Sequence, residues 1–288
     1  LKKEETIMAG QNYASASLNA VDERVYLESQ TMGAFDSKRI RLDFNGKNSV
    51  TIYNVDTVAE NDYMRSGLSR FGTLVELGTG TQTLTLTQDK SFSFSIDRGN
   101  YEDSMMVTES AKAIKRQVRE VSVPATDVYN LGIASAYAIA NSQGVVAGTA
   151  VAYNTVYSLI LAQQAALTEL KYSKQGRTLW ITPTVLNLLK RDPEFKQDCD
   201  TSYADNKKGV VGMVDGLTIK EVPASMLVTN FQFMITCKET LVAVNKFDMV
   251  RTIDNDKDVD GWICQGRRYH DCFVLGQKAT GIRVYTKS

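Results

Sequence analysis

The chain has 288 residues, 43% of them hydrophobic, which is enough for one large core or two smaller ones. Its 33 lysines and arginines balance 33 aspartates and glutamates, so general affinity for nucleic acid is not expected, although local basic patches are compatible with this balance. No apolar run is long enough to cross a membrane, and no charged and then apolar leader opens the chain, which argues against membrane contact and secretion.

The first part of the chain is predicted to be elongated. Residues 1–36 are polar and rich in alanine, serine and asparagine, and they predict an extended arm with one short helix around residues 18–27. The dipeptide Asn45-Gly46 favours the positive backbone angles of a tight turn, so residues 38–55 are predicted to form a first hairpin.

A longer, threonine-rich β-hairpin is predicted for residues 56–90. Two alternating runs flank the turn residues Gly78 and Gly80, and the alternation places Leu84 and Leu86 on one side of the second run. Because an isolated two-stranded hairpin is marginally stable in water, we expect a neighbouring subunit to cover it. The residues predicted to make that contact are Leu74, Leu77, Leu84 and Leu86.

A strand at residues 91–96 and a long helix at residues 103–121 are predicted to follow. Helical spacing gives this helix a single apolar stripe, and Pro124 is predicted to end it. The stripe consists of Val107, Ala111, Ile114, Val118 and Val121.

Residues 127–250 mix helices and strands in a pattern typical of a compact α/β block. Helices are predicted at residues 127–141 (capped by Asp127), 154–171 (capped by Asn154) and 183–190 (begun by Thr182-Pro183). Strands are predicted at residues 178–181, 210–214, 217–222, 231–236 and 241–244, and two more around Gly276.

Several passages within these elements match a known family in order and composition. TLTLTQDKSFSFSID before YEDS is similar to that family's passage from an extended loop into a spine helix. Its axial domain is matched by NTVYSLILAQQAALTEL, GRTLWITPTVLNLLKRDPEF and GVVGMVDGLTIKEVP, and its closing strands by YHDCFVLGQKATGIRVY. The chain thereby resembles, over nearly its whole length, the major capsid proteins of tailed bacteriophages, which have the Hong Kong 97-type fold.

The resemblance implies an α+β fold in which residues 1–36 form an N-terminal arm and residues 56–90 an extended loop, both lying over neighbouring subunits. Residues 127–250 would form the axial domain. The peripheral domain would combine residues 37–55, 91–126 and 251–288, with the spine helix at residues 103–121.

The resemblance also implies a function. Copies would assemble through pentamers and hexamers, in the host cytoplasm, into the icosahedral shell of a virion around double-stranded DNA bound non-specifically. Portal, scaffold and decoration proteins would be further partners, and Leu1 would follow a maturation cleavage. The alternative is an encapsulin-like nanocompartment or a gene-transfer particle with the same fold.

Some members of the family join the extended loop to a neighbour through a lysine–asparagine bond. That bond needs a lysine on the loop, and no lysine occurs between Asn48 and Asp89. We therefore expect no such cross-link in this chain.

No catalytic constellation supports an enzyme. The only histidine, His270, shares a strand face with Cys272 at a distance of about 7 Å, which is too far for direct proton transfer. The four cysteines contain no CxxC pair, which predicts buried thiols in a reducing compartment and neither disulfides nor zinc. No GxxxxGK[ST] phosphate loop occurs, so neither a cofactor nor a metal is expected.

An acidic run resembles the start of a calcium loop. Counted from Asp256, however, the twelfth position is Arg267, where such a loop needs a glutamate. Two interpretations stay open: a solvated turn between two strands, or a weak divalent-ion or interface site. The run consists of Asp254, Asp256, Asp258 and Asp260.

The long helix carries four basic residues near one face, Lys112, Lys115, Arg116 and Arg119. One interpretation is a solvated face that Glu109 and Glu120 balance at helical spacings. The other is contact with packaged DNA or with an adjacent acidic surface, which would be independent of sequence and sensitive to salt.

Overall fold

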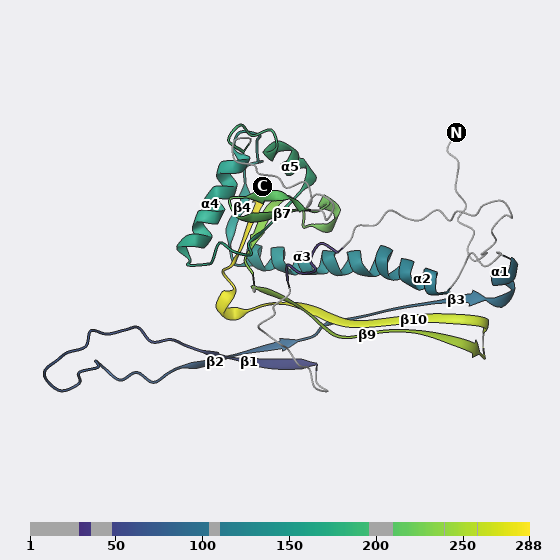
Figure 1. The fold of residues 1–288 in the computed structure, drawn as a ribbon, viewed down its shortest axis with the longest axis horizontal. Coiled ribbons are helices and arrows are strands. Elements are labelled where there is room, and N and C mark those ends of the chain that lie inside the picture. The colour runs from purple at the N-terminus through teal and green to yellow at the C-terminus, as the bar shows by residue number, and fades with distance from the viewer. Residues whose placement is uncertain (1–28, 36–47, 104–109, 196–209, 239, 258) are drawn as a thin grey trace.

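The computed structural model describes residues 29–35, 48–103, 110–195, 210–238, 240–257 and 259–288. Within these residues the strands form a two-stranded sheet, a three-stranded sheet and a six-stranded sheet. Figure 1 shows one long helix running between the six-stranded and the three-stranded sheet, while the two-stranded sheet projects from the body. The described part of the molecule is therefore a body with a long extension.

The six-stranded sheet has the order β4-β11-β8-β5-β7-β6 and is covered by helices on both faces (Figure 1). In β5, Leu179 and Ile181 pack with α4 and α5, whereas Trp180 points to the other face and packs with α3. This alternation is the period of two that a buried strand requires. The elements of this block are β4 (Gly144–Gly148), α4 (Val156–Glu169), β5 (Thr178–Ile181), α5 (Pro183–Leu189), β6 (Val210–Val214), β7 (Leu217–Glu221), β8 (Phe231–Thr236) and β11 (Ile282–Lys287).

Most predictions for this block are confirmed. Helix α5 begins at Pro183 with Thr182 as its N-cap, and β6 and β7 pair as the antiparallel hairpin predicted for them. Helix α4 follows Thr155, so the predicted cap at Asn154 is wrong by one residue. Short 3-10 turns, Ala224–Met226 and Gly276–Lys278, precede β8 and β11.

The three-stranded sheet has the order β3-β10-β9 and is antiparallel throughout. Its strands are β3 (Gln88–Asp97), which leads into α1 (Arg98–Asp103), β9 (Leu241–Asp256) and β10 (Val259–Val274).

Two strands differ from the predictions, β9 in its length and β11 in the sheet to which it belongs. Strand β9 extends far beyond the predicted residues 241–244, because its polar second half continues to pair with β10, with one register shift near its end. In the opposite sense, β11 pairs with β8 and β4 in the six-stranded sheet, not with the peripheral strands.

One continuous helix runs from Ser110 to Ala140, so the prediction that Pro124 ends it is wrong. It comprises α2 (Ser110–Gln117), a π-helical turn (Val118–Ser122) and α3 (Val123–Ala140). At 1.5 Å per residue its length is about 46 Å. Proline normally breaks a helix because its ring collides with a carbonyl of the preceding turn. The wide turn, in which the Val123 amide donates to the Val118 carbonyl, makes room for the ring.

The two-stranded sheet joins β1 (Ser49–Val55) to β2 (Thr79–Thr85). Gly78 and Gly80 do not form the predicted hairpin turn: Gly78 ends the long connection 56–78 and Gly80 lies in β2. Local turn signals favoured a pairing of neighbours, whereas the observed pairing joins runs far apart in sequence. The predicted Asn45-Gly46 turn and the helix around residues 18–27 lie outside the described residues.

Candidate interaction surfaces

The connection between β1 and β2, residues 56–78, presents apolar side chains to solvent. Leu68, Phe71 and Leu74 are 97%, 84% and 98% exposed. The predicted contact residue Leu77 is also exposed, as are Val58, Tyr63, Met64 and Val75. Contiguous exposed apolar surface of this kind marks a contact with a partner. Sequence reasoning found only Leu74 and Leu77 among these residues, because it predicted a regular hairpin over residues 56–90, whereas residues 56–78 contain no strand.

The other two predicted contact residues, Leu84 and Leu86, have different surroundings. Their exposed fractions are 4% and 3%, so they are already packed against their own chain. The predicted alternation is confirmed, because Thr83, Thr85 and Thr87 are exposed. We therefore correct the expectation that this pair stands free to contact a neighbouring subunit.

Hydrogen bonds fix the base of this extension to the end of β10. The Gln82 amide donates to the Val274 carbonyl at 2.9 Å and accepts from the Gly276 amide at 2.9 Å. The buried carboxylate of Asp271 accepts from both the backbone and the hydroxyl of Thr87, at 2.8 and 2.9 Å, and from the Tyr129 hydroxyl at 2.7 Å. The base is thus held, whereas the connection beyond it is exposed.

A second buried carboxylate, Asp127, holds the N-terminal segment 29–35. It lies inside α3 rather than at the predicted helix start, and only 2% of it is exposed. It accepts hydrogen bonds from the Ser29 hydroxyl at 3.0 Å, the Gln30 backbone N–H at 2.7 Å, and the backbone N–H and hydroxyl of Thr31 at 3.3 and 2.6 Å. Because an aspartate before an apolar run is typical of a helix N-cap, the sequence predicted a cap at Asp127 and not hydrogen bonds to residues far away in the chain.

The same segment also contacts the six-stranded sheet. Phe35 is 1% exposed and lies 5.4 Å from the Trp180 ring, centroid to centroid. The Lys220 ammonium lies 5.3 Å from that ring centroid and donates to the Gln30 carbonyl at 2.5 Å. Burial lowers the pKa of Lys220, and the nearby Asp127 carboxylate partly offsets this effect. Residues 29–35 therefore join the long helix to the sheet.

The basic residues predicted on the long helix divide into two environments. Lys112, Lys115 and Arg119 are exposed, and their spacing places them on one side of the helix. Arg116 is partly buried and pairs with Glu120 at 2.9 Å, as the solvated-face interpretation expected for this residue. The exposed stripe is available to an anionic surface.

The described residues show no arrangement for nucleophilic or metal chemistry. Burial raises the pKa of the Cys272 thiol to about 12 and that of the Cys237 thiol to about 11, so neither is a thiolate at neutral pH. In this part of the chain no three metal-ligating side chains come together. At the acidic turn, the Arg98 guanidinium lies 3.9 Å from Asp254 and 3.7 Å from Asp260. No helix among the described residues has the length and apolarity to span a membrane.

Comparison with known proteins identifies structures that share this fold. Models of protein families give no match, and neither do curated protein sequences. Among solved structures, the capsid structure of the cyanophage P-SCSP1u is similar with a TM-score of 0.70 and 12% identity, over 96% of this chain and 93% of that chain. The mature capsid of bacteriophage PhiM1 gives 0.66 and 14%, over 96% and 92%. A chain of Mycobacterium phage Che8 gives 0.67 and 16%, over 94% and 96%.

These similarities extend over nearly all of both chains, so the likeness belongs to the whole architecture and not to one block. The class that the fold defines is therefore the phage capsid fold, as the sequence motifs indicated. The α+β arrangement of a long helix between two sheets, with a projecting loop, is this chain's version of it.

Proposed function

We propose that this chain is the major capsid protein of a tailed bacteriophage. Copies of it assemble as pentamers and hexamers into an icosahedral shell, which encloses a double-stranded DNA genome. Assembly takes place in the host cytoplasm, and the assembled chain resides in the virion capsid. Its role is structural and not enzymatic, with portal, scaffold and decoration proteins as further partners.

The observation that carries the proposal is the contrast within the loop extension. Its base is fixed by Asp271 and Gln82, while Leu68, Phe71 and Leu74 beyond it lie almost fully in solvent. A single chain leaves this apolar surface in water, whereas a closed array of copies covers it in each of them. At about 25 cal/mol per Å² of apolar surface buried, many such contacts add up to a stable particle. The whole-chain similarity to phage capsid structures supports the same conclusion.

The test is electron microscopy of the purified full-length chain, together with extraction of nucleic acid from particles made in infected cells. We expect closed icosahedral shells, and double-stranded DNA inside the particles from infected cells. Shells that hold protein cargo and no nucleic acid would favour a nanocompartment, and shells that hold fragments of host DNA would favour a gene-transfer particle. A monodisperse monomer at high concentration would contradict the proposal.

A further inference from the structure

Strand β3 is an edge of the three-stranded sheet, and among the described residues no strand pairs with its outer side. It pairs with β10 over its ten residues, from Gln88 to Asp97, without a register shift. The N–H and C=O groups along such an outer edge are a template for a further strand. A partner strand can therefore extend the sheet here by backbone hydrogen bonds of the kind that join β3 to β10.

Edge strands usually carry features that prevent such pairing, namely charged side chains, proline, bulges or short length. Strand β9, the opposite edge, has a charged side chain at every second or third position from Lys246 to Asp254. The edge strands of the six-stranded sheet, β4 and β6, are five residues long, and each has a register shift. Between Ser91 and Ile96, β3 has no charge, no proline and no shift. Its outer edge is therefore open to a partner.

The side chains of this stretch are self-complementary. Residues 91–95, Ser-Phe-Ser-Phe-Ser, read the same in both directions. When two such strands pair antiparallel about Ser93, Phe92 of each copy lies opposite Phe94 of the other, and serine lies opposite serine. A two-fold contact uses the same surface of both copies, so self-complementarity is the property that it needs.

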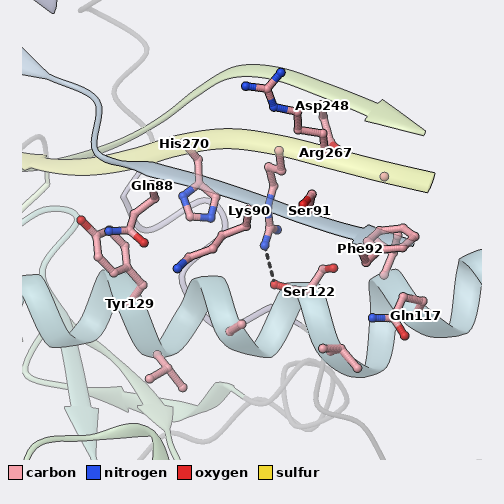
Figure 2. A pocket seen from close by; sticks show the side chains of 16 residues that line it. Gln88, Lys90, Ser91, Phe92, Gln117, Ser122, Tyr129, Asp248, Arg267 and His270 are labelled. Carbon is pink, nitrogen blue, oxygen red and sulfur yellow. Dashed lines mark hydrogen bonds between the residues drawn. The ribbon is translucent and has the colours of Figure 1, made fainter. Parts of the chain in front are cut away.

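The two phenylalanines leave part of their rings uncovered in the single chain. Both are half-buried, and their rings stack with 6.2 Å between centroids and an angle of 13° between planes. Figure 2 shows Phe92 at the side of β3 nearer to the long helix, whereas Ser93 is exposed on the other face. Aromatic side chains at opposite positions of paired strands stabilise the pairing. A second copy of β3 thereby extends the row of two rings to four.

We propose that β3 pairs antiparallel with β3 of a second copy of this chain, across a two-fold axis at Ser93. The pairing joins the two three-stranded sheets into one continuous sheet. In this register Asp89 lies opposite Asp97 of the other copy, and like charges at opposite positions destabilise pairing, so the paired stretch is Ser91–Ser95. The inference rests on the proposed function in that it names one contact between copies in the shell.

The test is disulfide cross-linking of full-length subunits that carry one added cysteine on β3. Ser93→Cys places two thiols opposite each other at the axis, where the Cβ atoms are about 5 Å apart, close to the span of a disulfide. We expect a covalent dimer that appears on a non-reducing gel and is lost on reduction. The described native cysteines Cys237, Cys264 and Cys272 are buried, and the wild-type chain is the control for every native thiol.

Ser95→Cys is the matched control for the register, because Ser95 is exposed on the same face of β3. In the proposed pairing, the two thiols of this variant lie four residues apart along the strands, about 14 Å, so it should not cross-link by itself. Mixed with Ser91→Cys it should cross-link, because residues 91 and 95 are opposite each other. Equal cross-linking of Ser93→Cys alone and Ser95→Cys alone would overturn the proposal.

A change of charge tests the same axis without oxidation. Because Ser93 is exposed, Ser93→Lys and Ser93→Asp should leave the fold of the single chain intact. Each places like charges directly opposite and should weaken the dimer about fivefold in sedimentation equilibrium. An equimolar mixture of the two variants should restore the wild-type affinity, since unlike charges then meet. A mixture no tighter than either variant would contradict the two-fold axis.

Strands β1 and β2 also lack charged residues, so they are the competing partners for β3 of a second copy. If Ser93→Cys cross-links to Thr51→Cys on β1 or to Thr83→Cys on β2, and not to itself, the pairing of β3 with β3 is wrong. It is also wrong if no variant cross-links in free subunits or in shells. Shells without the Ser93→Cys dimer would overturn this inference and leave the proposed function standing, whereas dimers of free subunits that never form shells would do the reverse.

Discussion

Leu74 and Leu86 have the same side chain and lie close in sequence, yet 98% of one and 3% of the other is exposed. The difference in exposure comes only from where the folded chain places each residue. Leu86 lies beside the base of the extension, where the Tyr269 hydroxyl donates to its carbonyl at 3.1 Å. Leu74 lies in the connection beyond the two paired strands. The two residues should therefore respond to the same substitution in different ways.

The double variant Leu74→Asp, Leu77→Asp should fold normally and fail to assemble. Because both side chains are exposed in the single chain, its free energy of unfolding should change by less than about 0.5 kcal/mol per site. The matched variant Leu84→Asp, Leu86→Asp places carboxylates in a packed region and should lose about 3 kcal/mol or more per site. Urea unfolding and shell yield by electron microscopy measure the two effects. Normal shells from the first variant would count against the loop contact.

His270 should make the stability of the chain depend on pH. Burial, and then the charge of Arg268, lower its pKa, while Asp271 and Asp248 oppose this shift and Lys90 adds to it. Below the ordinary histidine pKa of about 6.5, the unfolded chain therefore binds a proton that the folded chain does not. Stability is unaffected above that pH and falls as the pH drops through it.

The variant His270→Gln should lack this part of the pH dependence. The free energy of unfolding of both chains is measured with urea at about pH 7.5 and about pH 5.5, which lie on either side of the ordinary histidine pKa. The wild-type chain should lose more free energy of unfolding between these conditions than the variant does. Equal losses in both chains would show that His270 is not held neutral.

At the scale of secondary-structure elements, the loop extension and the N-terminal segment 29–35 are held in the same way. Each is tied to the body by a buried carboxylate on a regular element: Asp127 on α3 holds residues 29–31, and Asp271 on β10 holds Thr87. A carboxylate accepts several hydrogen bonds at once, so one residue fixes a short stretch of irregular chain. The body of the protein thereby fixes residues 29–31 and the base of the loop extension.

Asp127→Ala should release segment 29–35 without disrupting the sheets. The backbone N–H groups of Gln30 and Thr31 lose their acceptor, and the half-buried Lys220 loses its nearby negative charge. We therefore expect a loss of about 3 kcal/mol in the free energy of unfolding. Ser29→Ala, the control, removes one partly exposed hydrogen bond and should cost about 1 kcal/mol or less. Limited proteolysis should then cut the first variant near residues 29–35 faster than the control. Equal cleavage would contradict the anchoring role.

Local patterns predicted elements where local chemistry decides the structure. The Thr182-Pro183 start signal and the Asp215-Gly216 turn are such cases, and both are confirmed. Pro124 and Gly78 show where local patterns fail. A π-helical turn accommodates the proline, and β2 finds its partner in β1, across residues 56–78. Both outcomes depend on contacts between residues far apart in the sequence, which a short sequence window does not contain. One such contact is the hydrogen bond that Arg268 donates to the Ser122 carbonyl.

The same reason explains what the sequence revealed of the candidate surfaces. Exposed Leu74 and Leu77 were found because they are leucines beside a strand pattern, whereas Leu84 and Leu86 have the same pattern and are buried. Lys90 and Arg268, for example, become neighbours only through the pairing of β3 with β10. A single sequence shows which residue types lie near a turn, but it does not show which residues are their partners across a sheet.

At the scale of the whole molecule, the long helix separates two kinds of surface. Its α3 part packs against both the six-stranded sheet and β10, while its α2 part and the following turn present Lys112, Lys115 and Arg119 to solvent. The chain as a whole has no net charge, so this stripe is a local concentration of positive charge and not part of a general basic surface. In a closed shell, a stripe directed inward would meet the phosphates of the genome.

The variant Lys115→Glu, Arg119→Glu should therefore form shells in normal amounts that retain less DNA. Phosphate contacts release counterions, so loss of these contacts should lower the slope of DNA affinity against log salt by about 0.9 per contact removed. The control variant Lys171→Glu, Lys190→Glu makes the same change in net charge at exposed positions just after α4 and α5, in the block of the six-stranded sheet. It should leave the DNA content unchanged. The DNA-to-protein ratio of purified particles, and DNA release with increasing sodium chloride, measure both effects. Identical ratios and identical salt profiles in the two variants would establish that the stripe is a solvated face, balanced within its own helix by pairs such as Arg116 with Glu120.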